Sequence, residues 1–230
     1  MIPLRDTIPT RTFPGVTIAL IAANVLVFLH QVSLGAQGVA FVADFGAVPA
    51  QLTGAAPHAA PALPPPLTVL TSMFLHGGFG HLLGNMVFLW IFGNNVEDAM
   101  GHPRFLVFYL SCGVAAALSH VVAQPGSTVP MVGASGAISG VLGGYFLLYP
   151  HARIVTLVFL GFFAQTVQIP AFFFLGFWFL MQILPAFLSL RSSGGGVAWF
   201  AHVGGFLMGL ALIYAMAGPR IQWLRRGGQS

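Results

Sequence analysis

The chain has 230 residues, of which 57% are hydrophobic and only 5% carry a charge. Its mean hydropathy of +0.89 lies far above that of soluble domains, so the composition excludes a soluble globular protein and indicates a polytopic membrane protein. The formal net charge of +4 comes from eight arginines without a lysine, which are scattered along the chain and therefore form no basic face for nucleic acid.

Six apolar runs predict membrane-spanning helices, because each approaches the roughly 20 residues that cross the hydrocarbon core. The runs cover residues 13–32, 79–94, 105–122, 133–149, 171–190 and 197–217. We therefore expect an all-α membrane protein, with a six-transmembrane-helix bundle over residues 13–217 between tails over 1–12 and 218–230. The second run is short and would span only about 24 Å.

The connections between the runs differ in composition. Residues 33–78 form an expected outer loop, in which the prolines of 57–66 argue against regular helix. The sequence assigns this proline-rich insert no role. Residues 154–168 are apolar but interrupted by two glutamines, which indicates an interfacial loop or hairpin, and residues 191–196 read as a flexible glycine-serine turn.

The arginines indicate the orientation. Six spans place both termini on one side of the membrane, and if that side is the cytoplasm, every arginine except Arg191 lies inside, as the positive-inside rule prefers. Glu97 and Asp98 lie in an inner connection, where one of them is expected to pair with Arg104. Arginine without lysine and abundant alanine are typical of a GC-rich bacterial genome, so we expect a bacterial plasma membrane.

Three polar side chains from distant parts of the chain are expected at a similar depth. Ser135 begins the fourth run, His81 begins the second, and His202 lies one turn into the sixth. With both termini inside, all three runs are entered from the outer side. A buried ionisable side chain in a membrane span is costly, so this coincidence indicates a functional site.

Small residues surround these side chains. Gly133 and Gly136 flank Ser135 and leave room for a substrate or another backbone to approach its hydroxyl. Glycine recurs every four residues in both helices concerned, at Gly136, Gly140 and Gly144 in the fourth run and at Gly205 and Gly209 in the sixth. Such stripes allow membrane helices to pack almost backbone to backbone, with or without any chemistry between them. The two stripes could bring the serine hydroxyl and the imidazole within hydrogen-bond distance.

Serine is a weak nucleophile until a base removes its proton, and His202 could be that base. The four carboxylates of the chain lie in the tail and the loops, so any serine chemistry would use a Ser-His dyad. The oxyanion could take hydrogen bonds from the Ser135 backbone N–H and from the side chains of His81 and Asn85, which share a helix face. Taken singly, each of these residues could equally be structural.

Three motifs together resemble the rhomboid family of intramembrane serine proteases. They are Gly133-Ala134-Ser135-Gly136, His76-x-x-x-x-His81-x-x-x-Asn85 and Ala201-His202-x-x-Gly205-x-x-x-Gly209, and they occur in the right order on the right helices. The resemblance extends from Phe45-Gly46 through Asn94-Asn95-Val96-Glu97-Asp98 to the sixth run.

The resemblance implies Ser135 as nucleophile, His202 as general base, and His81 with Asn85 as oxyanion donors, without cofactor or metal. It also implies a water-filled cavity that opens outward, capped by the loop around 191–197, and a fifth helix that admits substrates from the side. Family substrates are membrane proteins cut near the outer end of a transmembrane helix. The outer loop departs from the family because it lacks the Trp-Arg pair of some members, which leaves its role in positioning open.

Two other functions remain open on the sequence. A catalytically silent relative could bind client membrane helices, although such relatives generally lose the serine or the histidine. A haem protein, metalloprotein or transporter could use the histidines, but the sequence contains no HExxH motif or tight Cys/His cluster. We expect transmembrane proteins and the lipid bilayer as partners.

Overall fold

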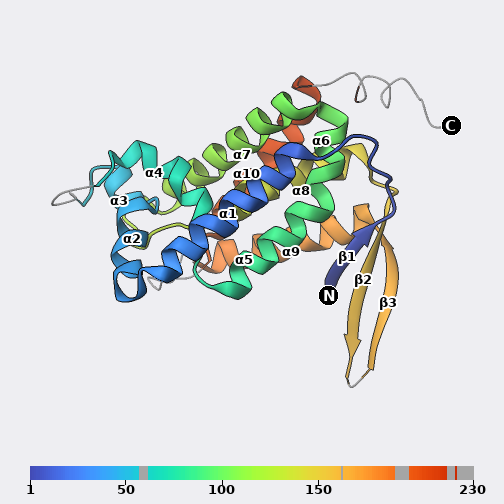
Figure 1. Ribbon diagram of the computed structural model, residues 1–230, viewed down its shortest axis with the longest axis horizontal. Helices are drawn as coiled ribbons and strands as arrows, with labels where there is room; N and C mark the ends of the chain where they lie inside the picture. Colours follow the sequence, from blue (N-terminus) through green and yellow to red (C-terminus); the bar gives the residue numbers. More distant parts are fainter. Residues whose placement is uncertain (57–61, 162, 190–196, 217–220, 222–230) are drawn as a thin grey trace.

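The computed structural model describes residues 1–56, 62–161, 163–189, 197–216 and 221. Most of them are helical (Figure 1). The helical elements are α1 (Gly15–Ser33), η1 (Gly35–Gln37), α2 (Gly38–Phe45), α3 (Pro49–Leu52), α4 (Pro65–Thr71), η2 (Ser72–Phe74), α5 (Phe79–Phe88), η3 (Leu89–Gly93), α6 (Asn94–Met100), α7 (His102–Ala123), α8 (Ser135–Leu148), α9 (Ala171–Ser189) and α10 (Trp199–Ala215). The strands are β1 (Ile2–Asp6), β2 (Arg153–Leu160) and β3 (Phe163–Pro170).

The described helices make this a mostly helical membrane protein. Three of them, α1, α7 and α9, are long and apolar enough to cross a membrane. A fourth candidate span is the pair Pro65–Phe74 and Phe79–Met100, whose two parts are bent by 80°. The helices α8 and α10 are apolar but shorter.

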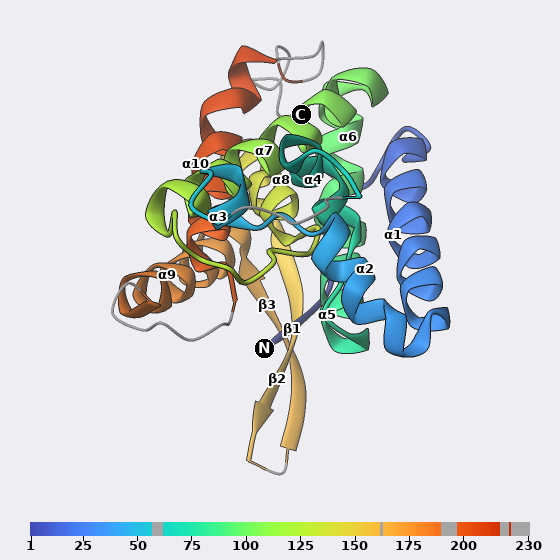
Figure 2. The same ribbon diagram turned by 90° about the vertical axis from the view of Figure 1, so that its left-hand side faces the viewer.

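Helix α8 lies at the centre of the bundle, with α7, α10 and the α5–η3 segment around it (Figure 2). Every residue from Gly136 to Tyr145 is buried. Its sequence permits this position, because glycine, alanine and serine dominate its first half and leave room for neighbouring helices. The element that begins with Ser135 is therefore enclosed by protein rather than exposed to lipid.

The second predicted span is longer than the sequence indicated. It continues from Phe79 through the π-helical turn η3 to Met100, so the acidic residues at 97 and 98 belong to a helix and not to a connection. Gly101 then adopts a left-handed φ of 82° and separates α6 from α7. Glycine adopts this conformation without steric cost, which explains a sharp break at this position.

Glu97 has a different partner from the one predicted. Its side chain is fully buried and accepts hydrogen bonds from the backbone N–H groups of Val16 and Thr17, at 2.9 and 2.7 Å, and from the Thr17 hydroxyl at 2.7 Å. It also contacts His102 Nδ1. The carboxylate thus caps the first turn of α1 from another helix, where N–H groups have no partner within their own helix. The expected pair with Arg104 is wrong for Glu97, and Asp98 accepts hydrogen bonds from Thr12.

The all-α expectation is wrong in one region. Strands β2 and β3 pair as an antiparallel hairpin, and β1 pairs with β2, from Ile2 opposite Leu157 to Asp6 opposite Ile154. The hairpin agrees with one of the two forms predicted for 154–168, whereas the third strand comes from the expected N-terminal tail. The sheet lies at the opposite end of the bundle from α2–α4, and the hairpin projects beyond the helices (Figure 1).

The outer loop contains more helix than its prolines suggested. The elements η1, α2 and α3 lie within 33–56, and α4 begins at Pro65, because proline is tolerated in the first helical turn. Residues 57–61 of the proline-rich insert, the turn at 191–196 and all of the C-terminal tail except residue 221 lie outside the described residues.

Candidate active site

Ser135 is the first residue of α8, and the backbone before it is fixed by Gly133. Gly133 has a φ of 119°, a conformation that side chains with a Cβ rarely adopt. A Cβ at this position would lie 2.7 Å from His81 Cε1 and 2.9 Å from its Nε2. The Gly133 N–H also donates to the Ser72 carbonyl at 2.9 Å. Both the conformation and the close approach of His81 therefore require glycine.

The outer loop holds the segment that leads to Ser135. Ala47 and Met131 exchange two backbone hydrogen bonds, of 3.1 and 2.8 Å, as an isolated β-bridge. The Ala50 N–H donates to the Ser127 carbonyl at 2.9 Å, and the Thr53 hydroxyl donates to the Pro125 carbonyl at 2.9 Å. The described part of the loop thus supports the turn between α7 and α8.

The glycine stripes bring α8 and α10 into backbone contact. A Cβ added to Gly205 would lie 2.1 Å from the Gly136 carbonyl oxygen, and one added to Gly209 would lie 2.0 Å from that of Gly140. On the other side of α8, a Cβ at Gly140 would meet Cys112 Cβ at 2.3 Å. No side chain fits between these helices, so the residues at the N-terminal ends of α8 and α10 are held at a fixed separation.

This contact places His202 beside Ser135. The His202 Nε2 lies 2.8 Å from Ser135 Oγ, within hydrogen-bond distance. The other ring nitrogen, Nδ1, lies 2.9 Å from Oε1 of Gln182 on α9. The imidazole also contacts the rings of Trp178 and Trp199, at centroid distances of 6.2 and 6.0 Å. The ring is therefore oriented by groups on α8, α9 and α10.

His81 and Asn85 lie on the other side of Gly133. The Gly77 N–H donates to His81 Nδ1 at 3.3 Å, so the proton of a neutral ring lies on Nε2, the nitrogen that faces Gly133. Asn85 Nδ2 lies 3.5 Å from the position of a Gly133 Cβ. This nitrogen is buried and has no hydrogen-bond partner among the described residues. Two N–H donors therefore converge on the turn that precedes Ser135.

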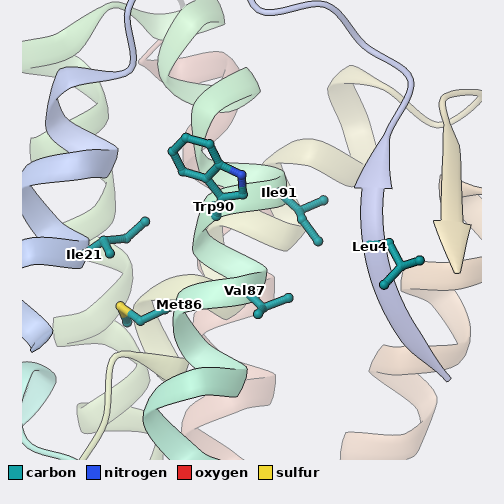
Figure 3. Close-up of a pocket in the computed structure, with 6 residues that line it drawn as sticks. All are labelled: Leu4, Ile21, Met86, Val87, Trp90 and Ile91. Carbon is teal, nitrogen blue, oxygen red and sulfur yellow. The ribbon is translucent and has the colours of Figure 1, made fainter. Parts of the chain in front are cut away.

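This arrangement can activate a hydroxyl and stabilise an oxyanion close to it. It contains a serine hydroxyl, an imidazole nitrogen 2.8 Å from that hydroxyl, and N–H donors from the first turn of α8 and from α5. No group of three His, Cys, Asp or Glu side chains suited to a metal ion occurs within the ranges that the structure describes. A separate pocket between α1, the α5–η3 helix and β1 is lined only by apolar side chains (Figure 3): Leu4, Ile21, Met86, Val87, Trp90 and Ile91.

Sequence reasoning missed Gln182 and the two tryptophans around His202. A signal was present, because the stretch 154–190 contains no charged residue or histidine, and an amide in such a run needs a partner when it is buried. Gln182 is only 7% exposed. The two other glutamines of the stretch, at 165 and 168, were noticed, but they are exposed on β3.

Comparison with known proteins agrees with the sequence motifs. The sequence model of the Rhomboid domain matches residues 66–219. The mitochondrial Rhomboid protein 1 of Saccharomyces cerevisiae is 32% identical over 150 residues, which cover 63% of this chain and 40% of the relative. The human mitochondrial presenilin-associated rhomboid-like protein is 30% identical over 168 residues, covering 69% and 39% of the two chains.

A bacterial relative, the rhomboid protease GluP of Bacillus subtilis, is 31% identical over 152 residues, which cover 66% of this chain and 26% of the relative. The chain thus spans well under half the length of these relatives. The residues that the Rhomboid domain model matches include Ser135, His202, His81 and Asn85.

Proposed function

Because this chain belongs to the rhomboid family, we propose that it is a serine endopeptidase that cleaves transmembrane segments of other membrane proteins. The observation that carries the proposal is the 2.8 Å separation of Ser135 Oγ and His202 Nε2. The names of relatives such as the rhomboid protease GluP support the same reaction class. The reaction uses this chain's side chains and water, with no cofactor or metal.

The proposed reaction proceeds in two steps. His202 Nε2 takes the proton from Ser135 Oγ as the oxygen attacks the scissile carbonyl carbon. The oxyanion takes hydrogen bonds from the Ser135 N–H, His81 Nε2–H and Asn85 Nδ2–H. His202 then gives its proton to the leaving amine, and the C–N bond breaks to leave an acyl ester on Ser135. In the second step His202 deprotonates a water, which attacks the ester and restores the hydroxyl.

We also propose a six-span topology, with both termini and the sheet in the cytoplasm and Ser135 near the outer surface. In this topology α8 and α10 join the candidate spans α1, α5–α6, α7 and α9, and residues 13–217 form the membrane domain. The pairing of β1 with β2 supports it, because the two strands must lie on the same side of the membrane. Four crossings between them, through α1, α5–α6, α7 and α8, satisfy this condition. The arginine distribution supports the orientation, and arginine without lysine together with abundant alanine supports the bacterial plasma membrane as the location.

The experiment compares purified wild type with the variants Ser135→Ala and His202→Ala in liposomes that contain a transmembrane substrate. A serine-directed fluorophosphonate provides a second measurement. We expect wild type to cleave and to be labelled, and both variants to lose cleavage by at least about 1,000-fold. The matched controls are Ser33→Ala and His30→Ala, both exposed at the end of α1, which should cleave like wild type.

Undiminished cleavage by either site variant would overturn the assignment of that residue. A wild-type protein that binds the substrate helix but neither cleaves it nor reacts with the probe would instead identify the chain as a silent binding relative. The two outcomes are distinguished by measuring substrate binding in the same liposomes.

A further inference from the structure

Gln182 is a buried amide in the most apolar part of the chain. It lies in the middle of α9, with phenylalanines, leucines and methionine as its neighbours in sequence. Burying an amide is unfavourable unless its polar atoms find hydrogen-bond partners. Both ends of this side chain have one: Nε2 donates to the Trp178 carbonyl at 3.0 Å, and Oε1 lies 2.9 Å from His202 Nδ1.

These two contacts fix which way the amide points. The Trp178 carbonyl oxygen can only accept a hydrogen bond, so the atom facing it must be the Gln182 nitrogen. The Gln182 oxygen, which can only accept, therefore faces His202. Its partner, Nδ1, must carry a proton, and in a neutral imidazole the other nitrogen, Nε2, then has a free lone pair. That nitrogen lies beside Ser135 Oγ.

We propose that Gln182 is a positioning residue that holds His202 in the Nδ1–H tautomer and so keeps Nε2 available as a base. The bond from α9 also fixes the rotation of the ring, together with the contacts of Trp178 and Trp199. The two carboxylates of the α5–α6 span, Glu97 and Asp98, accept hydrogen bonds from Thr17 and Thr12, and the neutral amide of Gln182 supplies the acceptor for His202 at much lower burial cost than a charge would. The catalytic part of this proposal rests on the proposed function, whereas the tautomer does not.

The test replaces Gln182 by methionine, which has a similar volume but no hydrogen-bonding amide. We expect kcat to fall about tenfold, because a smaller fraction of the protein holds His202 in the Nδ1–H tautomer. KM should change less than about twofold, because Gln182 does not contribute to substrate binding. Gln182→Glu restores an acceptor oxygen, and its protonated acid can also donate to the Trp178 carbonyl, so this variant should regain most of the lost activity. The matched control is Gln165→Met on the exposed face of β3, which should match wild type.

A second measurement reads the tautomer directly and does not require proteolysis. Nitrogen-15 NMR of histidine-labelled protein in nanodiscs, with His202→Asn to assign the signal, distinguishes a protonated from an unprotonated Nδ1. We expect a protonated Nδ1 in wild type and in Ser135→Ala, and a mixture of tautomers in Gln182→Met. If the methionine variant fails to fold, Gln182→Asn carries the test, because its shorter amide cannot reach both partners.

An unchanged His202 signal in Gln182→Met or Gln182→Asn, or wild-type kcat in a folded variant, would overturn the positioning role. If the tautomer shifts as expected while even wild type cleaves nothing, the proposed protease function fails and the role of Gln182 stands. If wild type cleaves and the substitutions change neither the signal nor kcat, the function stands and the role of Gln182 fails.

Discussion

Asp6 fixes the N-terminal strand to the helices through two short hydrogen bonds. Its Oδ2 accepts from the Tyr145 hydroxyl and from Asn95 Nδ2, both at 2.6 Å. Burial raises the pKa of the Asp6 carboxyl, and the hydrogen bond from Tyr145 opposes this rise because it stabilises the carboxylate. Since the pKa stays above its ordinary value of 3.8, the folded chain binds this proton more tightly than the unfolded chain does. Protonation of Asp6 therefore stabilises the folded state. This contribution to the free energy of unfolding is complete below pH 3.8, the ordinary pKa, and is lost as the pH rises through the pKa that Asp6 has in the folded chain.

Removing the hydroxyl of Tyr145 should therefore have a pH-dependent effect on stability. Tyr145→Phe deprives the carboxylate of a donor and should lower the free energy of unfolding by about 1.5–3 kcal/mol at neutral pH. At a pH below the ordinary Asp6 pKa of 3.8, where the raised pKa keeps the carboxyl protonated in the larger share of folded molecules, the loss should be smaller. Unfolding by denaturing detergent at the two pH values measures it. Tyr214→Phe is the matched control, and an equal loss in Tyr145→Phe at both pH values would contradict the prediction.

At the scale of single residues, the sequence located the polar groups but not all of their partners. Ser135, His202, His81 and Asn85 were proposed from their depth and spacing, and the structure brings them together around Gly133. Their roles stay proposals until the variants are measured. Gln182 was missed because a lone glutamine in a helix has no motif, and only the fold shows that its oxygen meets an imidazole.

At the scale of elements, the α8–α10 contact determines the distance between the two proposed catalytic side chains. Gly209→Ala places a methyl group 2.0 Å from the Gly140 carbonyl oxygen, and backbone cannot move aside as a flexible side chain can. We expect the helices to separate, with a loss of at least about 1–3 kcal/mol in stability and at least tenfold in kcat because the base is displaced. Detergent unfolding and the liposome cleavage assay measure the two losses.

Gly176→Ala on α9 is the matched control, because a Cβ there meets nothing within 4 Å. This substitution should be neutral or stabilising by up to about 1 kcal/mol, since alanine is the better helix former. If Gly209→Ala behaved like Gly176→Ala, the tight contact between α8 and α10 would have no energetic importance.

Helices were easier to predict than their ends and connections. The runs that became α1, α7 and α9 were located within a few residues, because continuous apolar composition is a strong signal. The helix that begins at Phe79 was predicted to end at residue 94, before the acidic residues at 97 and 98. It continues to Met100, and its Glu97 caps α1, a contact that the sequence does not reveal. The hairpin was not distinguished from an interfacial loop, because a short uncharged apolar run fits both. The pairing of β1 depends on residues far away in the sequence, which no local pattern reports.

At the scale of the whole molecule, the sheet and the outer loop should face opposite sides of the membrane. Single cysteines at Gln165 in β3 and Ala55 in the outer loop, introduced into Cys112→Ser, test this with a membrane-impermeant thiol reagent. We expect Ala55→Cys to react in intact cells or right-side-out vesicles, and Gln165→Cys only in inverted vesicles. Both positions are exposed in the structure. Labelling of both from the same side would contradict the six-span topology.

The pairing of β1 with β2 also constrains the order in which the protein is made. Asp6 lies opposite Ile154, so the first strand leaves the ribosome long before its partner exists. At a synthesis rate of about 5–20 residues per second, the intervening chain takes on the order of ten seconds. In the six-span topology proposed above, four hydrophobic helices enter the bilayer during that interval while the N-terminal segment stays on the cytoplasmic side. Closing the sheet is thus a late event of biogenesis, and a ribosome-bound chain that ends before the hairpin would present an unpaired strand to chaperones and proteases.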